Sequence, residues 1–207
     1  MNSTKDKLEH ETPHFGNTLL GAVPSVVYNE DCVEGLKRFS DNHFDLAIVD
    51  PPYGIRAGSV NFQNGTRKKP SKFHKINDWD NAIPTAEYWE QLFRVSKNQI
   101  VWGGNYMTEH LKPTSSWLFW DKGTGDNDFA DGELAWTSFD KKPMYIDYAW
   151  IGFGYINQGE KKIHPTHKPI YLYDELLKES PKNGFTVGIN DDVTFTSLAY
   201  DESYKLD

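Results

Sequence analysis

The sequence predicts an α/β protein built on a doubly wound, mostly parallel sheet. The short apolar run Leu46–Val49 is typical of a strand that is buried on both faces of a parallel sheet. Residues 32–39 and 86–95 carry apolar side chains at helical spacing, and each segment is followed by another apolar run. Strands and helices that alternate in this way indicate helices packed against a central parallel sheet.

Length and composition favour a single folded domain. The chain has 207 residues, 38% hydrophobic and 14% aromatic, and a net charge of −8. It has neither an eighteen-residue apolar run nor a signal-peptide core near its start, so we expect a cytoplasmic protein without a membrane partner. A single cysteine, Cys32, excludes an internal disulfide and a cysteine-rich zinc site, and the scattered histidines predict no metal.

Taken in order, the chain predicts three regions: a flexible arm over 1–21, a main domain over 22–180 and an atypical tail over 181–207. Asn29-Glu30-Asp31 is suited to capping a helix that follows. The elements expected after the arm are strands over 26–28, 46–49, 98–102, 117–120, 133–138, 144–150 and 185–189, and helices over 32–39, 86–95 and 171–178.

The central strand ends in a loop with distinctive chemistry, Asp50-Pro51-Pro52-Tyr53. Two consecutive prolines cannot continue a strand, so the chain leaves the sheet at its carboxyl edge, where open α/β sheets bind ligands. The loop offers a carboxylate, the Pro51 carbonyl and the ring of Tyr53. Such a set suits a planar heterocycle that bears an amino group, held by two acceptors and an aromatic face.

A basic run follows this loop. Between Pro51 and Asn77 there is no Asp or Glu, whereas six cations fall there: Arg56, Arg67, Lys68, Lys69, Lys72 and Lys75. Such a run is either a solvated surface loop or an arm that neutralises phosphates. Beside a loop suited to a heterocycle, we interpret residues 54–77 as a DNA-binding arm.

Asp50-Pro51-Pro52-Tyr53 resembles the catalytic tetrapeptide of the S-adenosylmethionine-dependent DNA amino-methyltransferases, in which a leading aspartate is more usual in the adenine enzymes. The segments that begin WDNAIPTAEYW and SSWLFWDKG, and the box His164-Pro165-Thr166-His167-Lys168-Pro169, are also similar to adenine methylases. The resemblance covers residues 23–178, in the order of the family's β arrangement. It implies a Rossmann-like methyltransferase sheet.

The resemblance also implies an activity: methyl transfer to the amino group of a flipped adenine in double-stranded DNA, within restriction-modification. Asp50 and the Pro51 carbonyl would orient the amino nitrogen, and Pro52 and Tyr53 would complete the catalytic loop. Residues implied for S-adenosylmethionine are Asp31, Cys32, Asp50, His164, Lys168 and Pro169. Asp31 is equally interpreted as a helix cap, and His164 as a cap of local backbone. Alternatives are an inactive DNA-binding remnant and a cytosine-amino or RNA methyltransferase.

The resemblance ends near residue 180. The family continues with a glycine-rich cofactor loop, but no GxG follows Gly154 in this chain. From Gly184 onward, GFTVGINDDVTFTSL is instead faintly similar to a segment of pyruvate:ferredoxin oxidoreductases. We therefore expect a sheet that is incomplete in its cofactor half, with an uncovered flank on the central strand, and with marginal stability or self-association.

Overall fold

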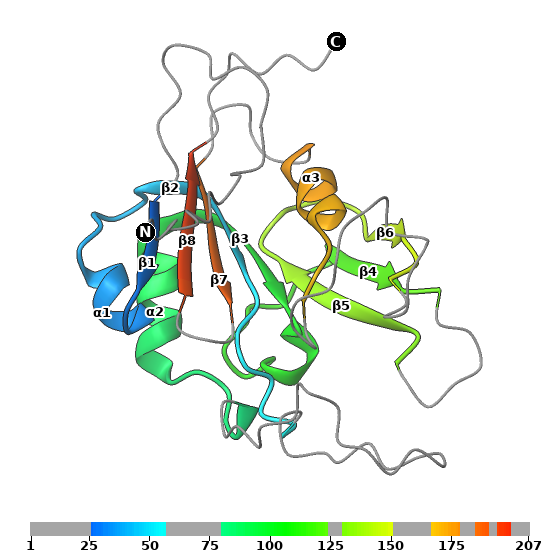
Figure 1. The fold of residues 1–207 in the computed structure, drawn as a ribbon, viewed down its shortest axis with the longest axis horizontal. Helices are drawn as coiled ribbons and strands as arrows, with labels where there is room; N and C mark the ends of the chain where they lie inside the picture. The colour runs from blue at the N-terminus through cyan, green and yellow to red at the C-terminus, as the bar shows by residue number, and fades with distance from the viewer. Residues whose placement is uncertain are drawn as a thin grey trace, which may run out of the picture.

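A computed structural model describes residues 26–56, 80–123, 130–150, 167–178, 185–190 and 194–199 (Figure 1). The strands are β1 (Val26–Asn29), β2 (Phe44–Val49), β3 (Ser96–Trp102), β4 (Trp117–Asp121), β5 (Gly132–Thr137), β6 (Met144–Asp147), β7 (Phe185–Asn190) and β8 (Thr194–Ala199). The helices are α1 (Cys32–Lys37), α2 (Ala86–Val95), α3 (Ile170–Lys178) and the 3-10 turn η2 (Gly104–Tyr106). The α/β class is confirmed, and the helix over 86–95 has the predicted bounds.

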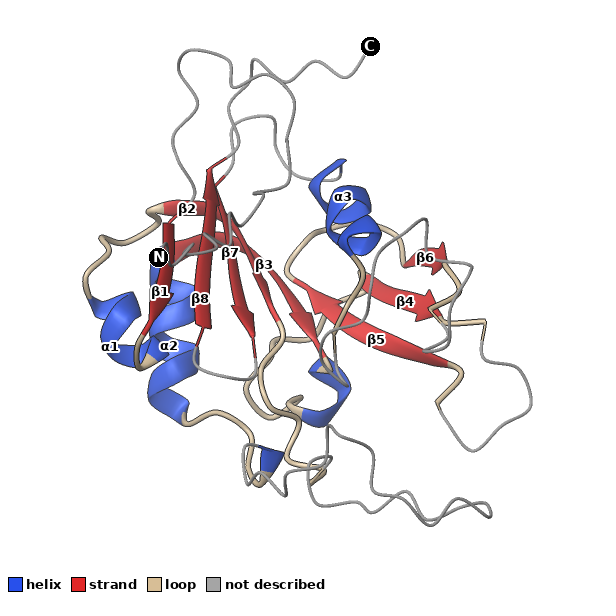
Figure 2. Cartoon of the chain, viewed as in Figure 1, coloured by secondary structure: helices blue, strands red, loops and turns tan. Residues whose placement is uncertain are grey.

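The strands form one mixed sheet in the order β1-β8-β7-β2-β3-β5-β4-β6 (Figure 2). Its centre is parallel, as predicted, because β2 runs parallel to both β7 and β3. The flanks are largely antiparallel, since β5 pairs antiparallel with β3 and β4, and β8 pairs antiparallel with β7 and β1. The sheet is therefore less uniformly parallel than the alternating sequence pattern indicates.

The flank of β2 that was expected to be uncovered is paired with β7. Leu46 lies opposite Thr186 and Val49 opposite Ile189 in a parallel register. The expectation assumed that a whole strand, helix and strand crossover was needed to fill this place. The tail instead supplies two antiparallel strands, β7 and β8, separated by three residues, which needs far fewer residues than a parallel crossover. The strand predicted over 185–189 is therefore confirmed as a neighbour of β2, and the expected uncovered flank is wrong.

Alternate side chains of β2 divide the hydrophobic core into two layers. Ala47 and Val49 pack in one cluster with Leu36 of α1 and Leu92 of α2. The other cluster contains the alternate residues of β2 together with side chains of β3 and of α3, the helix that covers this face. Its members include Leu46, Ile48, Ile100, Trp102, Leu172 and Leu176. Helices thus cover both faces of the central strands, as the period-two burial pattern of a central strand requires.

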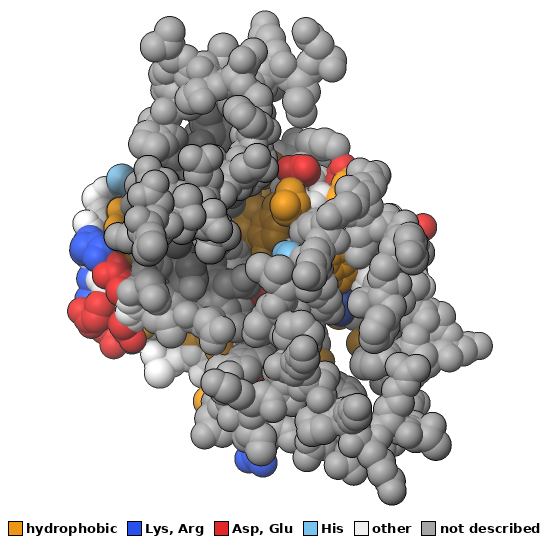
Figure 3. Space-filling view, viewed as in Figure 1, with side chains coloured by type: hydrophobic (Ala, Val, Ile, Leu, Met, Phe, Trp, Pro, Cys, Tyr) orange, Lys and Arg blue, Asp and Glu red, His pale blue; other side chains and the backbone are white. Residues whose placement is uncertain are grey.

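Capping and surface charges stabilise α1 locally. The Asp31 carboxylate accepts hydrogen bonds from the backbone N–H groups of Val33 and Glu34, at 2.9 and 3.0 Å, as expected of a cap. Oppositely charged side chains lie next to one another over this helix (Figure 3), because Lys37 pairs with Glu34 and Glu87. The helix interpretation of Asp31 is therefore confirmed.

On the other face of the sheet, α3 keeps apolar side chains on its outer side. Ile170 is 59% exposed and Tyr171 is 38% exposed, and Figure 3 shows hydrophobic side chains over this helix. Among the described residues, no helix combines the length and apolar character that crossing a bilayer would need.

Candidate functional site

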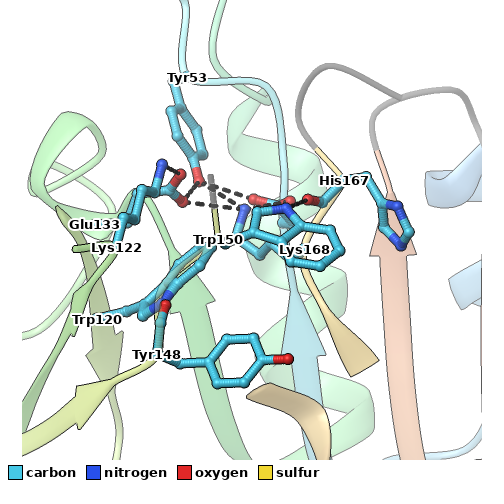
Figure 4. A network of polar contacts seen from close by, with 9 residues as sticks. Tyr53, Trp120, Lys122, Glu133, Tyr148, Trp150, His167 and Lys168 are labelled. Carbon is cyan, nitrogen blue, oxygen red and sulfur yellow. Dashed lines mark hydrogen bonds and ion pairs between the residues drawn. The ribbon is translucent and has the colours of Figure 1, made fainter. Parts of the chain in front are cut away.

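A cluster of charged side chains lies at the carboxyl end of the parallel strands. Asp50 follows β2 directly, Glu133 lies on β5, and Lys168 lies two residues before α3. The side chains of Asp50 and Lys168 are almost fully buried, at 4% and 3% exposure. Figure 4 shows Tyr53, Glu133 and Lys168 pointing toward one another from different elements of the fold. The fold therefore gathers groups that are more than 100 residues apart in sequence.

Lys168 is the centre of this cluster. Its ammonium group donates a hydrogen bond of 2.5 Å to Asp50 Oδ2 and one of 3.2 Å to Tyr53 Oη. It also forms an ion pair of 3.2 Å with Glu133 Oε2. A lysine ammonium has three N–H donors, so these three partners account for all of them. Lys168 therefore has no donor left for a further anion.

Tyr53 and Glu133 close the network. The Tyr53 hydroxyl donates to Asp50 Oδ1 at 2.8 Å, and Glu133 Oε2 lies 3.3 Å from the same hydroxyl. The other oxygen of Glu133 accepts a hydrogen bond from Lys122. Two carboxylates thus face two ammonium groups, which leaves the cluster close to neutral. Ionised groups are found in a protein core when they are paired with opposite charges in this way.

The cluster perturbs the pKa values of Asp50, Lys168 and Tyr53. Burial raises the pKa of Asp50, although the Lys168 ammonium opposes this shift. Burial acts to lower the pKa of Lys168, but the carboxylate of Asp50 and the other groups around it outweigh burial and raise this pKa well above its ordinary value. Burial also raises the pKa of Tyr53, so the phenol remains a donor. Lys168 is therefore an ammonium group at neutral pH and cannot serve as an amine nucleophile.

Glu133 should make folding stability depend on acid pH. Burial would raise the pKa of its carboxyl, but Lys168 and Lys122 outweigh burial and lower it from 4.5 to about 2. A pKa lowered in the folded state stabilises the protein above the unfolded value, and this contribution is lost as pH falls from 4.5 toward 2. We expect the stabilisation to reach about 3 kcal/mol at neutral pH.

Urea unfolding of the protein and of Glu133→Gln between about pH 6 and pH 3 measures this dependence. The free energies of unfolding of the two proteins should converge as the pH falls, because only the unmodified chain loses the carboxylate. Asp50 is present in both proteins, but the Glu133 carboxylate raises the pKa of Asp50, so the comparison reports the loss of Glu133 together with its effect on Asp50. A difference that stays constant over this range would show that Glu133 is not held ionised by the two lysines.

The loop that carries Tyr53 is fixed by a second buried carboxylate, that of Asp80. Asp80 Oδ1 accepts the backbone N–H groups of Tyr53 and Gly54 at 2.7 and 2.8 Å, and its carbonyl accepts the N–H of Arg56 at 2.9 Å. Asp80 is only 1% exposed. Two consecutive N–H groups on one carboxylate hold a turn rigidly. Asp80 therefore sets the direction in which the Tyr53 ring leaves the loop.

The Tyr53 ring has two different neighbours. On one side lies Gly103, whose φ of 66° favours glycine and where an added Cβ would lie 2.2 Å from Tyr53 Cε1. On another side the ring of Tyr106 stacks at a centroid distance of 5.3 Å and an interplanar angle of 19°. Tyr106 is 48% exposed. The backbone at Gly103 is therefore a fixed wall, whereas Tyr106 is a side chain with access to solvent.

Tryptophan side chains hold the segments around the cluster in place. Trp150 Nε1 donates to the His167 carbonyl at 2.8 Å, which anchors the residue before Lys168 (Figure 4). Trp120 Nε1 donates to the Tyr148 carbonyl at 2.9 Å. The Lys168 ammonium nitrogen lies 5.3 Å from the centroid of the Trp102 ring, which adds a cation–π contact. The buried Nε1 of Trp102 has no hydrogen-bond partner among the described residues.

The structure brings together part of the predicted site. Asp50, Tyr53 and Lys168 are in contact, Pro51 and Pro52 connect the first two, and Pro169 is buried just before α3. Asp31 and the half-buried Cys32 lie at the start of α1, and Cys32 packs against the core. Of the predicted DNA-binding cations only Arg56 is described. His164 and five of the basic residues lie outside the described residues: Arg67, Lys68, Lys69, Lys72 and Lys75. Double-stranded DNA as a partner and the division at 21 and 180 stay predictions.

Sequence reasoning missed four residues that shape the site. Glu133 lies near the start of β5, Lys122 directly follows β4, Asp80 precedes α2, and Tyr106 ends η2. Each is an isolated polar or aromatic side chain near the end of an element or in a loop, a signal too frequent to be specific. The described residues contain no group of three or more metal-ligating side chains.

Comparisons with known proteins point away from the predicted family. No protein-family model matches the chain. Curated proteins named pyruvate-flavodoxin oxidoreductase do match, each over a short segment. The protein from Enterobacter agglomerans is 43% identical over 70 residues, which are 34% of this chain and 5% of that protein. Those from a Nostoc species and Rhodospirillum rubrum are 59% and 53% identical over 34 and 36 residues, in each case 3% of the relative.

These matches contradict the identification as a DNA adenine amino-methyltransferase. The named proteins are oxidoreductases, so the predicted methyl transfer to DNA, the role in restriction-modification and the cofactor S-adenosylmethionine are wrong on this finding. The same finding gives no support to the alternatives, an inactive DNA-binding remnant and a cytosine-amino or RNA methyltransferase. The names agree instead with the faint resemblance of the tail. The DPPY tetrapeptide misled the interpretation because a short motif describes a loop shape and not a reaction. This chain spans only 3–5% of the length of these relatives.

Proposed function

We propose that the carboxyl edge of the sheet binds a planar, amino-bearing ring compound between Tyr53 and the Asp50 carboxylate. The observation that carries the proposal is the Tyr53 ring, which stacks on Tyr106 and whose hydroxyl donates to this buried carboxylate. Tyr106 is half exposed and occupies the place that a planar ligand would take on the Tyr53 ring. Stacked rings at this separation contribute about 0.5–1.5 kcal/mol beyond their buried area.

The electrostatics of the cluster favour an amino donor over an anion. The three N–H donors of Lys168 contact Asp50, Tyr53 and Glu133, so no donor remains for a carboxylate or phosphate ligand. Among the described residues, Asp50 Oδ1 accepts a hydrogen bond from the Tyr53 hydroxyl alone, and a carboxylate oxygen has room for a second hydrogen bond. An amino group on the ligand would take this position as the ligand replaces Tyr106.

The position in the fold agrees with this use. Helices on both faces of the parallel strands support a doubly wound, Rossmann-like arrangement around β7, β2 and β3. Ligands of such sheets bind beyond the carboxyl ends of the strands. Buried titratable groups with perturbed pKa values that cluster there are a further indication of a binding site.

Calorimetric titration with 4-aminoquinazoline and with quinazoline, which lacks the amino group, tests the proposal. We expect the amino compound to bind about tenfold more tightly, as one hydrogen bond to a charged acceptor predicts. Tyr106→Ala should strengthen binding because the competing ring is removed, and Asp50→Asn should abolish the preference for the amino compound. Equal affinities for the two compounds in the unmodified protein would refute the proposal.

A redox role is a second candidate, and the short matches to pyruvate-flavodoxin oxidoreductases favour it. The chain itself has one cysteine, so it cannot supply the set of thiolates that usually holds an iron–sulfur cluster. A redox group of another kind, or a further polypeptide, would have to carry the electrons. Pyruvate-dependent reduction of a viologen dye by the purified chain would support this candidate. A colourless protein without dye reduction would exclude it.

A further inference from the structure

A hollow lies at the opposite edge of the sheet from the Lys168 cluster, near the amino end of β3. It has a volume of about 570 Å³, which is within the range of small-ligand sites. Its walls come from the start of β3, the segment before β4 and the residues after β5. Asp50 and Lys168 do not line it, so it is separate from the cluster described above.

One buried side chain in this hollow has a fixed orientation. Gln99 is 5% exposed, and its Nε2 donates both hydrogens to Ser96, at 2.7 Å to the carbonyl and 3.0 Å to Oγ. Ser96 Oγ in turn donates to the Leu92 carbonyl at 2.6 Å. With both amide hydrogens used, the side-chain oxygen of Gln99 is left as an acceptor, and it has no hydrogen-bond partner in the described part of the chain.

Two exposed charges of opposite sign line the same hollow. Lys112 and Asp140 both contribute to its walls, and neither forms an ion pair within the described ranges. Lys97, the other lysine in the lining, is paired with Asp45. The Lys112 backbone is held in place, because Trp136 Nε1 donates to its carbonyl at 2.8 Å. The hollow therefore presents a free ammonium group and a free carboxylate from separate segments.

Aromatic side chains form the apolar part of the wall. Phe93 and Trp136 pack edge to face with ring centroids 6.2 Å apart, and both line the hollow together with Phe139. Rings in this arrangement offer an apolar surface of fixed shape. The site thus combines an apolar wall, a fixed acceptor and two charges of opposite sign.

We propose that this hollow binds a zwitterionic ligand of the α-amino acid class with an apolar side chain. The ligand carboxylate pairs with Lys112, its ammonium group donates to Asp140 and the Gln99 oxygen, and its side chain packs on Phe93 and Trp136. A ligand with a single charge would leave one of the two protein charges unpaired. The hollow therefore selects for both charges on one small molecule.

Titration with L-phenylalanine, phenylacetate and phenethylamine, followed by tryptophan fluorescence of the purified chain, tests this site. The three compounds share the ring and differ in charge. We expect L-phenylalanine to bind about tenfold more tightly than either singly charged compound. Lys112→Met should remove its advantage over phenethylamine, and Asp140→Asn should remove its advantage over phenylacetate.

Two exposed residues outside the hollow provide matched controls. Lys142→Met and Asp147→Asn change the same charges elsewhere on the surface and should leave all three affinities unchanged. Both pairs of variants alter exposed side chains, so folding is retained and can be checked by circular dichroism. Equal affinities for the three compounds would overturn the proposal. So would a loss of affinity in the control variants as large as that in Lys112→Met and Asp140→Asn.

Discussion

Replacing Lys168 by methionine should lower the free energy of unfolding by about 3–5 kcal/mol. The ammonium group is 3% exposed and contacts Asp50, Glu133 and Tyr53. Methionine fills a similar volume but leaves the buried Asp50 carboxylate without its cation. Removing one partner of a buried ion pair costs far more than the pair contributes, because the remaining charge stays desolvated. Urea denaturation followed by circular dichroism measures the change.

Lys142→Met is the matched control for this substitution. Lys142 is exposed, and the change should alter the free energy of unfolding by less than about 0.5 kcal/mol. The double variant Asp50→Asn with Lys168→Met should recover part of the lost stability, since no buried charge then lacks its partner. A loss below about 1 kcal/mol for Lys168→Met alone would show that water reaches the pair and that the cluster is not a buried network.

Gly103→Ala should have the second largest effect and should act on the Tyr53 ring. The new Cβ would lie 2.2 Å from Tyr53 Cε1, and the φ of 66° is strained for alanine. Backbone strain of this kind costs about 1–3 kcal/mol, and the clash adds to it unless the ring moves. We expect both a lower free energy of unfolding and a loss of 4-aminoquinazoline binding, because the displaced ring separates from Asp50.

Gly35→Ala gives the comparison. Gly35 lies inside α1, and an added Cβ would approach only the flexible Glu30 side chain, at 3.3 Å. Alanine favours helix over glycine by about 1 kcal/mol, so this variant should be neutral or slightly more stable. If Gly103→Ala were as benign as Gly35→Ala, the ring of Tyr53 would not be held against the backbone as described.

The fold was predictable wherever a local pattern determines the structure. The apolar face of the helix Ala86–Val95 and the buried residues of β2 follow from side-chain spacing alone. Asp31 predicts the start of α1 because its carboxylate can cap a helix. The order of the strands was not predictable from such patterns. The pairing of β7 with β2 joins segments about 140 residues apart, and no local signal specifies it.

The site was predictable in part for the same reason. The two prolines after Asp50 fix a loop at the carboxyl edge of β2, so Asp50 and Tyr53 could be identified from the sequence. Glu133 and Lys122 could not, because they reach the cluster only through the antiparallel pairing of β4 and β5. The family was wrong because the motif fixes the loop and leaves its chemistry to the residues around it.

A crystal structure of the protein soaked with 4-aminoquinazoline would show whether the ligand enters the stack on Tyr53. We expect the ring to lie on Tyr53 in the place of Tyr106, with its amino nitrogen about 3 Å from the Asp50 carboxylate and with the contacts of Lys168 preserved. A compound bound elsewhere, with the stack of Tyr53 and Tyr106 intact, would contradict this expectation and would leave the cluster as a purely structural network.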